Sequence, residues 1–122
     1  MTMGTYSGGD KLMPGIFELR KNADELFYFH FVDTAGELLM LSGDYDDKAE
    51  AEQAIKDVKV GTLTANQIAA GKVPAGDTFF VIKDTAGDII AKSVLFNSRM
   101  LFDSALHRVK DNTCVAEIVD LT

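Results

Sequence analysis

Two stretches decide the fold: residues 27–42 read FYFHFVDTAGELLMLS, and residues 78–93 read TFFVIKDTAGDIIAKS. Both contain Asp-Thr-Ala-Gly, 51 positions apart, and apolar residues match apolar residues on either side of it. At the same offset, Tyr45 matches Phe96 further along the chain. A constant offset over roughly thirty positions indicates a duplicated structural unit.

Each stretch predicts a β-hairpin. Aromatic residues alternate before the first bend, as at Phe29 and Phe31, which is typical of a half-buried strand. In the two bends, an aspartate can cap the turn and a glycine can adopt positive φ: Asp33 and Gly36, then Asp84 and Gly87. Alternation then assigns one inward-facing set and one more exposed set to the return strands: Leu38, Met40, Ile89 and Ala91 inward, and Leu39, Leu41, Ile90 and Lys92 outward.

A helix is predicted to follow each hairpin. Short polar residues that favour helix N-caps precede it: Asp46 or Asp47 in the first copy, and Asn97 or Ser98 in the second. Each helix carries an apolar stripe at positions i, i+3, i+4 and i+7: Ala51, Ala54, Ile55 and Val58, then Phe102, Ala105, Leu106 and Val109. Gly61 and Asn112 occupy the positions where a left-handed residue commonly ends a helix.

These elements predict one α+β domain over residues 14–122, with repeat 1 at about 14–61, repeat 2 at about 65–112 and a closing strand at 115–121. A hairpin and one helix bury too little surface to be stable alone. We therefore expect the two copies to share a core around a pseudo-twofold axis, with both helices on an antiparallel sheet. Residues 1–13, which are rich in Gly, Ser and Thr, are expected to form a flexible leader.

The composition excludes several classes of function. Nineteen acidic residues against twelve basic ones give a net charge of −7, which repels nucleic-acid phosphates. No segment reaches the roughly 18 apolar residues that a membrane span requires. Cys114 is the single cysteine, so an internal disulfide is impossible. We expect a cytoplasmic protein with no nucleic-acid partner and no membrane partner.

Candidate catalytic and metal-binding groups are few. His30 and His107 are the only histidines, they do not occupy equivalent positions, and no spacing typical of a metal site is present. Cys114 has no histidine near it in the sequence and is interpreted as a small packing residue. The acidic residues from Asp44 to Glu52 are interpreted as a solvated cluster at a helix start. The sequence therefore predicts no catalytic residue, no metal and no cofactor.

Several short motifs follow one another along the chain: Phe17-Glu18-Leu19, the aromatic run from Phe27 to Phe31, Gly36 to Leu39, Ser42, Tyr45, Ala54-Ile55, Val58-Lys59 and the closing Val119-Asp120-Leu121-Thr122. In these residues the chain resembles the YegP-like domains of unknown function. The resemblance implies an α+β fold of tandem repeats. It implies no reaction, because that family has no established catalytic residues.

The two copies differ most at one surface. The first copy has Asp44, Ala49, Glu50 and Ala51 where the second has the apolar residues Leu95, Met100, Leu101 and Phe102. An apolar version of a polar surface is typically covered, either by the rest of the chain or by a partner. We expect a non-catalytic binding or protein-interaction module that contacts a protein or a second copy there. Two alternatives stay open: a small enzyme that uses His30 or Asp33 between the copies, and an acidic mimic that binds a cationic partner.

Overall fold

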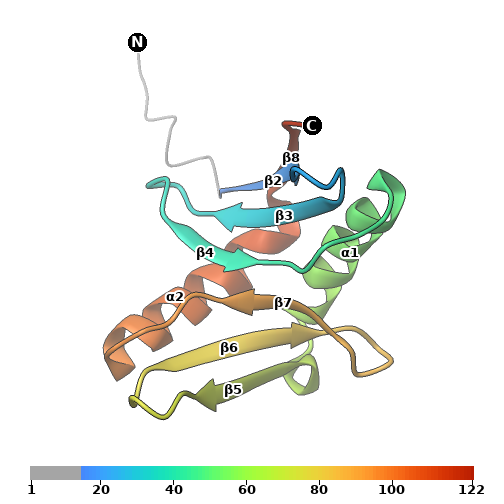
Figure 1. The fold of residues 1–122 in the computed structure, drawn as a ribbon. Coiled ribbons are helices and arrows are strands. Elements are labelled where there is room, and N and C mark those ends of the chain that lie inside the picture. Colours follow the sequence, from blue (N-terminus) through green and yellow to red (C-terminus); the bar gives the residue numbers. More distant parts are fainter. Residues whose placement is uncertain (1–14) are drawn as a thin grey trace.

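The computed structural model describes residues 15–122, so the expected leader at 1–13 lies outside the described residues (Figure 1). A seven-stranded sheet in the order β5-β6-β7-β4-β3-β2-β8 is crossed on one face by two helices, which gives an α+β fold. Its elements, in chain order, are β2 (Ile16–Lys21), β3 (Phe27–Val32), β4 (Leu38–Leu41), α1 (Lys48–Gly61), the short 3₁₀ helix η2 (Ala65–Gln67), β5 (Ile68–Lys72), β6 (Thr78–Lys83), β7 (Ile89–Ser93), α2 (Arg99–Asn112), the 3₁₀ helix η3 (Thr113–Val115) and β8 (Glu117–Asp120).

The sheet is mixed, so the prediction of an antiparallel sheet is wrong at one edge. Neighbouring strands from β5 to β2 pair antiparallel, but β8 pairs parallel with β2, with Phe17 opposite Ile118. Parallel neighbours cannot be joined by a tight hairpin, and β8 reaches β2 only after a helix has crossed the sheet; it runs antiparallel to β7, the strand that precedes that helix. In this chain α2 carries out that crossing before β8 (Figure 1).

The inward and outward sets predicted for β4 and β7 are only half correct. Met40 and Ala91 are buried and Leu41 and Lys92 are exposed, as predicted. The remaining four residues differ from the prediction: Leu39 and Ile90 are buried, Leu38 is half-buried and Ile89 is 61% exposed. The cause is a β-bulge in each hairpin, where the register shifts between Phe31 and Val32 and between Ile82 and Lys83. A bulge inserts one extra residue and so puts two consecutive side chains on one face.

The helix starts are as predicted and the helix ends are not. The side chain of Asp47 accepts from the Glu50 N–H, and that of Ser98 accepts from the Leu101 N–H, so both are N-caps. Gly61 and Asn112 lie inside the helices, and each helix ends in a right-handed threonine. The hydroxyl groups of Thr62 and Thr113 reach the Lys59 and Val109 carbonyls, at 3.0 and 2.9 Å, and lie 2.6 Å from each other, so their two protons are shared among these three contacts. These side chains satisfy helix-end carbonyls that a left-handed turn would otherwise satisfy.

One continuous core lies between the sheet and the helices. Phe17, Phe29, Phe31 and Phe80 are fully buried in it, together with Ile55 of α1 and further residues from both halves of the chain. The apolar stripe of α1 is buried as predicted, and in α2 Ala105 and Val109 are buried while Phe102 and Leu106 are half-buried against the core. Fully burying one large apolar side chain contributes roughly 1.5–3 kcal/mol, so this cluster dominates the stability.

The two halves use the same hydrogen bonds at positions 51 residues apart. The Ser42 hydroxyl accepts from the Phe29 N–H and the Ser93 hydroxyl accepts from the Phe80 N–H, both at 2.9 Å. In each bend the aspartate side chain accepts two backbone N–H bonds at 2.9 Å, from Ala35 and Glu37 in one and from Ala86 and Asp88 in the other. The local chemistry of the two hairpins is therefore the same.

Candidate functional site

Three of the four residues predicted for the interaction surface are exposed at the start of α2. Leu95 and Leu101 are each 50% exposed and Met100 is 79% exposed. Phe102 is half-buried instead, and its ring contacts Phe80 and Phe96 edge-on, with centroids 5.8 and 6.2 Å apart. The exposed set is thus smaller than the expected one, because the aromatic member packs against the core.

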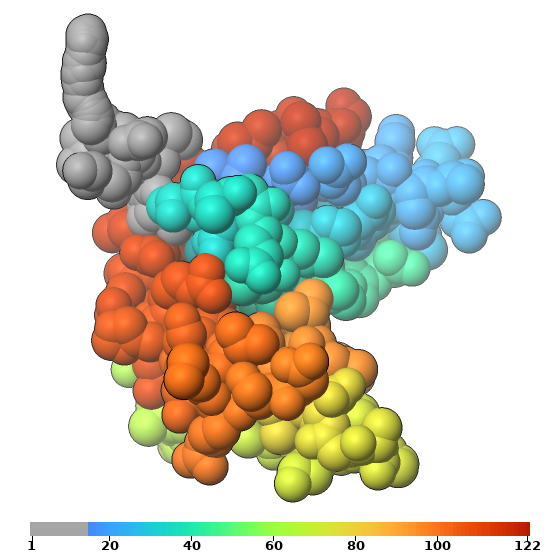
Figure 2. Space-filling model, turned by 90° about the vertical axis from the view of Figure 1, so that its left-hand side faces the viewer, coloured from blue at the N-terminus to red at the C-terminus, as the bar shows by residue number. Residues whose placement is uncertain are grey.

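A cavity of about 370 Å³ opens beside these residues. In Figure 2 the surface of the β3–β4 hairpin, in teal, lies next to that of β7 and α2, in orange. We call this cavity the Leu95–Leu101 groove, and it is lined by Glu37, Asp77, Val94, Leu95, Phe96, Asn97, Leu101 and Arg108. Its lining combines apolar side chains from the second half with carboxylates from two different turns.

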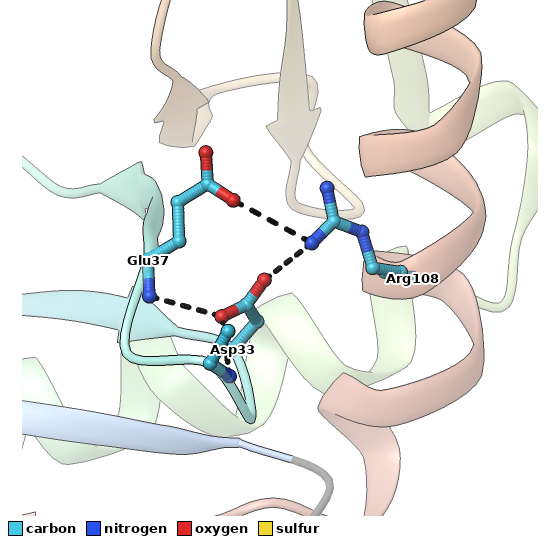
Figure 3. Close-up of polar contacts among 4 residues, drawn as sticks. Asp33, Glu37 and Arg108 are labelled. Atoms are coloured by element: carbon cyan, nitrogen blue, oxygen red, sulfur yellow. Dashed lines mark hydrogen bonds and ion pairs between the residues drawn. The ribbon is translucent and has the colours of Figure 1, made fainter.

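An ion pair between the two halves forms one side of the groove (Figure 3). Arg108 of α2 donates through Nη1 to the Oδ2 atom of Asp33, whose side chain is only 3% exposed, and Nη1 lies 3.6 Å from the Glu37 carboxylate. The Nε atom of Arg108 is buried and has no partner among residues 15–122. The other carboxylate oxygen of Asp33 caps its own turn. One buried carboxylate thus holds both its hairpin and the opposing helix.

The second bend has no such ion pair. Asp84 makes the same two turn bonds as Asp33, but no lysine or arginine of the described chain lies within 4.0 Å of its carboxylate. Nothing in the sequence predicted the difference, since Arg108 and Asp33 are 75 positions apart and have no shared motif. Sequence reasoning also missed Glu37 and Asp77 as lining residues of the groove.

The candidate catalytic residues are not brought together. His30 is half-buried on β3, and burial, followed by the charge of Arg20, lowers its pKa below 6.5, while Glu18 raises it. His107 is exposed on α2 and lies 3.0 Å from the Asp111 carboxylate. Cys114 is exposed, so its interpretation as a packing residue is wrong; it lies in η3, just beyond the helix.

Asp33 lines a separate cavity of about 360 Å³ beside Gly15 and Glu18. Its carboxylate accepts hydrogen bonds from Arg108 and from two backbone N–H groups. Residues 15–122 contain no cluster of three or more histidine, cysteine or acidic side chains suited to a metal ion. Within the same residues, neither helix has the length and apolar character needed to cross a bilayer.

The chain is similar to a family of proteins of unknown function. Residues 22–68 match the model of a domain of unknown function, DUF1508. The chain is 27% identical to UPF0339 protein YegP of Shigella flexneri over 110 residues. This match covers 90% of the chain and 100% of YegP. The chain is also 27% identical to UPF0339 protein PA0329 of Pseudomonas aeruginosa, over 88% of this chain and 98% of the relative.

Two solved structures share the fold. UPF0339 protein SO3888 from Shewanella oneidensis superposes with a TM-score of 0.86 at 26% identity, over 90% of this chain and 93% of that one. YegP from E. coli, described as a protein of unknown function, gives a TM-score of 0.84 at 26% identity, over 90% and 95%. These similarities support a relationship between this chain and the YegP-like UPF0339 family, DUF1508. That family is one of unknown function, and the relatives indicate no catalytic activity.

Proposed function

We propose that this chain is a non-catalytic protein-interaction module, and that its Leu95–Leu101 groove binds a segment of a partner protein that carries an apolar side chain next to a basic one. The observation that carries the proposal is the coincidence, at one cavity, of exposed leucines with two lining carboxylates and a single lining cation. A cytoplasmic location, expected from the single cysteine, stays a prediction.

The apolar half of the argument rests on Leu95, Leu101 and the neighbouring Met100. Large apolar side chains that are half or more exposed and gathered beside a cavity mark interaction sites more often than scattered ones do. Leucine side chains at a concave site can bury a partner's apolar side chain, and the free energy gained rises with the apolar area removed from water.

The polar half of the argument concerns charge. Glu37 and Asp77 line the groove, whereas its one lining cation, Arg108, is bound by the buried Asp33 and lies 3.6 Å from Glu37, so the acids outnumber the base. The whole chain carries a net charge of −7, which speeds the approach of cationic partners. A lysine or arginine beside an apolar anchor therefore fits this lining better than an acidic segment does.

The test uses a synthetic peptide in which leucine and lysine alternate, titrated into the full chain. We expect the methyl signals of Leu95 and Leu101 to shift in NMR spectra, with binding that weakens as salt is added. The double substitution Leu95→Ser, Leu101→Ser should weaken binding by about tenfold, because two apolar contacts are lost. The matched control, Val60→Ser with Leu63→Ser, removes two exposed apolar side chains outside the groove and should leave binding unchanged.

Equal affinity in both double variants would contradict the proposal. Sedimentation of the free chain supplies a second check. If the chain self-associates and Leu95→Ser, Leu101→Ser abolishes the association, the occupant is a second copy and a basic partner segment is ruled out.

We also propose that the domain consists of two copies of one strand-strand-strand-helix unit related by a pseudo-twofold axis. At such an axis, equivalent residues of the two copies must meet each other. Leu41 lies opposite Lys92 where β4 pairs with β7, and these two residues are 51 positions apart. The buried hydroxyl groups of Thr62 and Thr113, which are also 51 positions apart, are hydrogen-bonded at 2.6 Å. Two such meetings, one in the sheet and one between the helix ends, support one axis through both.

A further inference from the structure

In the part of the chain that the structure describes, one edge strand of the sheet, β5, has a strand neighbour on one side only, whereas β2 is paired on both sides. At one edge β8 pairs with β2, and the Leu121 N–H donates to the Leu19 carbonyl at 2.8 Å. At the other edge β5 pairs only with β6 among the described strands (Figure 1). An edge strand with unpaired peptide groups is a template for another strand.

The peptide groups on the open side of β5 can be identified. Thr78 and Phe80 of β6 lie opposite Lys72 and Ala70, and their N–H groups donate away from β5, to the Phe96 carbonyl and the Ser93 hydroxyl. Since residues along an antiparallel pair alternate in the direction of their hydrogen bonds, the peptide groups of Ala70 and Lys72 point outward. No hydrogen bond from within residues 15–122 reaches them.

The counterpart of Ala70 in β2 is a position that β8 covers. Ala70 lies 51 residues after Leu19, which accepts from the C-terminal strand segment. On α1, two lysines hold that segment: Lys48 Nζ lies 2.6 Å from the Asp120 carboxylate, and Lys59 Nζ donates to the Ala116 carbonyl at 2.8 Å.

The helix next to the open edge carries bases at the matching positions. Arg99 and Lys110 of α2 lie 51 residues after the two lysines of α1. Arg99 is bound only by an exposed pair with Asp103 at 3.4 Å, and such a pair is worth at most about 1 kcal/mol. Both bases are therefore available to a strand that docks on β5.

We propose that the open edge of β5 binds an extended segment of a partner protein, parallel to β5, with the chemistry of this chain's own residues 116–120. That chemistry is the β-branched pair Ile118-Val119 between two acids, Glu117 and Asp120; Arg99 would hold the second carboxylate as Lys48 holds Asp120. The edge is a second site, distinct from the groove, because none of the β5 residues lines that cavity.

The probe is an N-acetylated synthetic peptide with the sequence of residues 115–122, VAEIVDLT, titrated into the full chain. We expect slowed amide hydrogen exchange at Ala70, the outward position that corresponds to Leu19 in the pairing of β2 with β8. Ala70→Pro removes the outward N–H alone, which an edge strand tolerates, and should weaken binding by about tenfold. Arg99→Glu should weaken it as well, whereas Lys56→Glu, which inverts an exposed base on α1, should not.

Four results would overturn this assignment. Amide changes confined to Leu19 would mean that the peptide replaces β8 on β2. Arg99→Glu keeps the fold because the Arg99 side chain is exposed, so unchanged affinity in this variant would show that Arg99 does not anchor the peptide. Unchanged affinity in Ala70→Pro would show that the peptide does not bind at the β5 edge. A free chain that dimerises in sedimentation, and no longer does so as Ala70→Pro, would identify a second copy as the occupant in place of a partner protein.

Discussion

At the scale of single residues, Asp33 illustrates how one side chain connects local and long-range structure. Its Oδ1 atom accepts two backbone N–H bonds within the turn, while its Oδ2 atom binds Arg108 of the opposing half. The turn bonds were predictable, since aspartate commonly caps its own turn. The ion pair was not, because only the folded chain brings α2 to this bend.

Replacing Arg108 should expose the difference between the two bends. Arg108→Met leaves a carboxylate that is 3% exposed without its counter-charge, which should cost about 2 kcal/mol, below the range for fully buried pairs because the arginine is partly exposed. Asp84→Asn, at the bend without an ion pair, should cost less than about 1 kcal/mol. Urea unfolding followed by circular dichroism measures both, and equal losses would show that the ion pair contributes nothing.

His30 predicts a pH dependence. Burial and Arg20 lower its pKa in the folded chain, so the unfolded chain binds the proton more tightly. The free energy of unfolding therefore decreases as the pH falls through 6.5, the ordinary pKa of histidine, and increases again as the pH rises. The decline should be smaller in His30→Gln than in the parent chain between about pH 7 and pH 5. Thermal unfolding at several pH values tests this, with His107→Gln as the exposed control.

At the scale of elements, local signals predicted what local interactions decide. The hairpin bends, the N-caps Asp47 and Ser98 and the buried stripe of α1 all depend on residues within a few positions of one another. The bulges at Leu39 and Ile90 follow instead from cross-strand pairing, which alternation alone does not reveal. In the groove, exposed leucines could be predicted from the difference between the copies, but the carboxylates came from distant turns.

Gly61 provides an element-scale prediction. A Cβ atom there would lie 2.7 Å from Cγ2 of Ile82 and 3.1 Å from the Lys83 carbonyl, so α1 and β6 would have to separate. Alanine is normally the better helix former by about 1 kcal/mol. We expect Gly61→Ala to destabilise the chain by about 1–2 kcal/mol nonetheless, because overpacking outweighs helix propensity. The melting temperature of Gly61→Ala, compared with that of the parent chain, tests this. A higher value in the variant would show that the packing of α1 against β6 has room for the added methyl group.

At the scale of the whole molecule, the proposed duplication explains both sites. The groove opens where the hairpin of one half meets the helix of the other, so it exists only when the halves are joined. The open edge arises because the chain after α1 continues through η2 directly into β5, whereas the chain after α2 is free to form β8. Sequence periodicity predicted a hairpin followed by a helix in each half, but not that the linkage of the halves would leave the two sheet edges unequal.

The two halves of the chain share one core, and we predict that they unfold together. Native-state hydrogen exchange of the full chain tests it most directly, through the opening free energies of the slowest amides in β3, β6, α1 and α2. We predict one common value for all four elements. If the slowest amides of one half open at a free energy lower by about 2 kcal/mol or more, the halves are separate cooperative units and the account is contradicted.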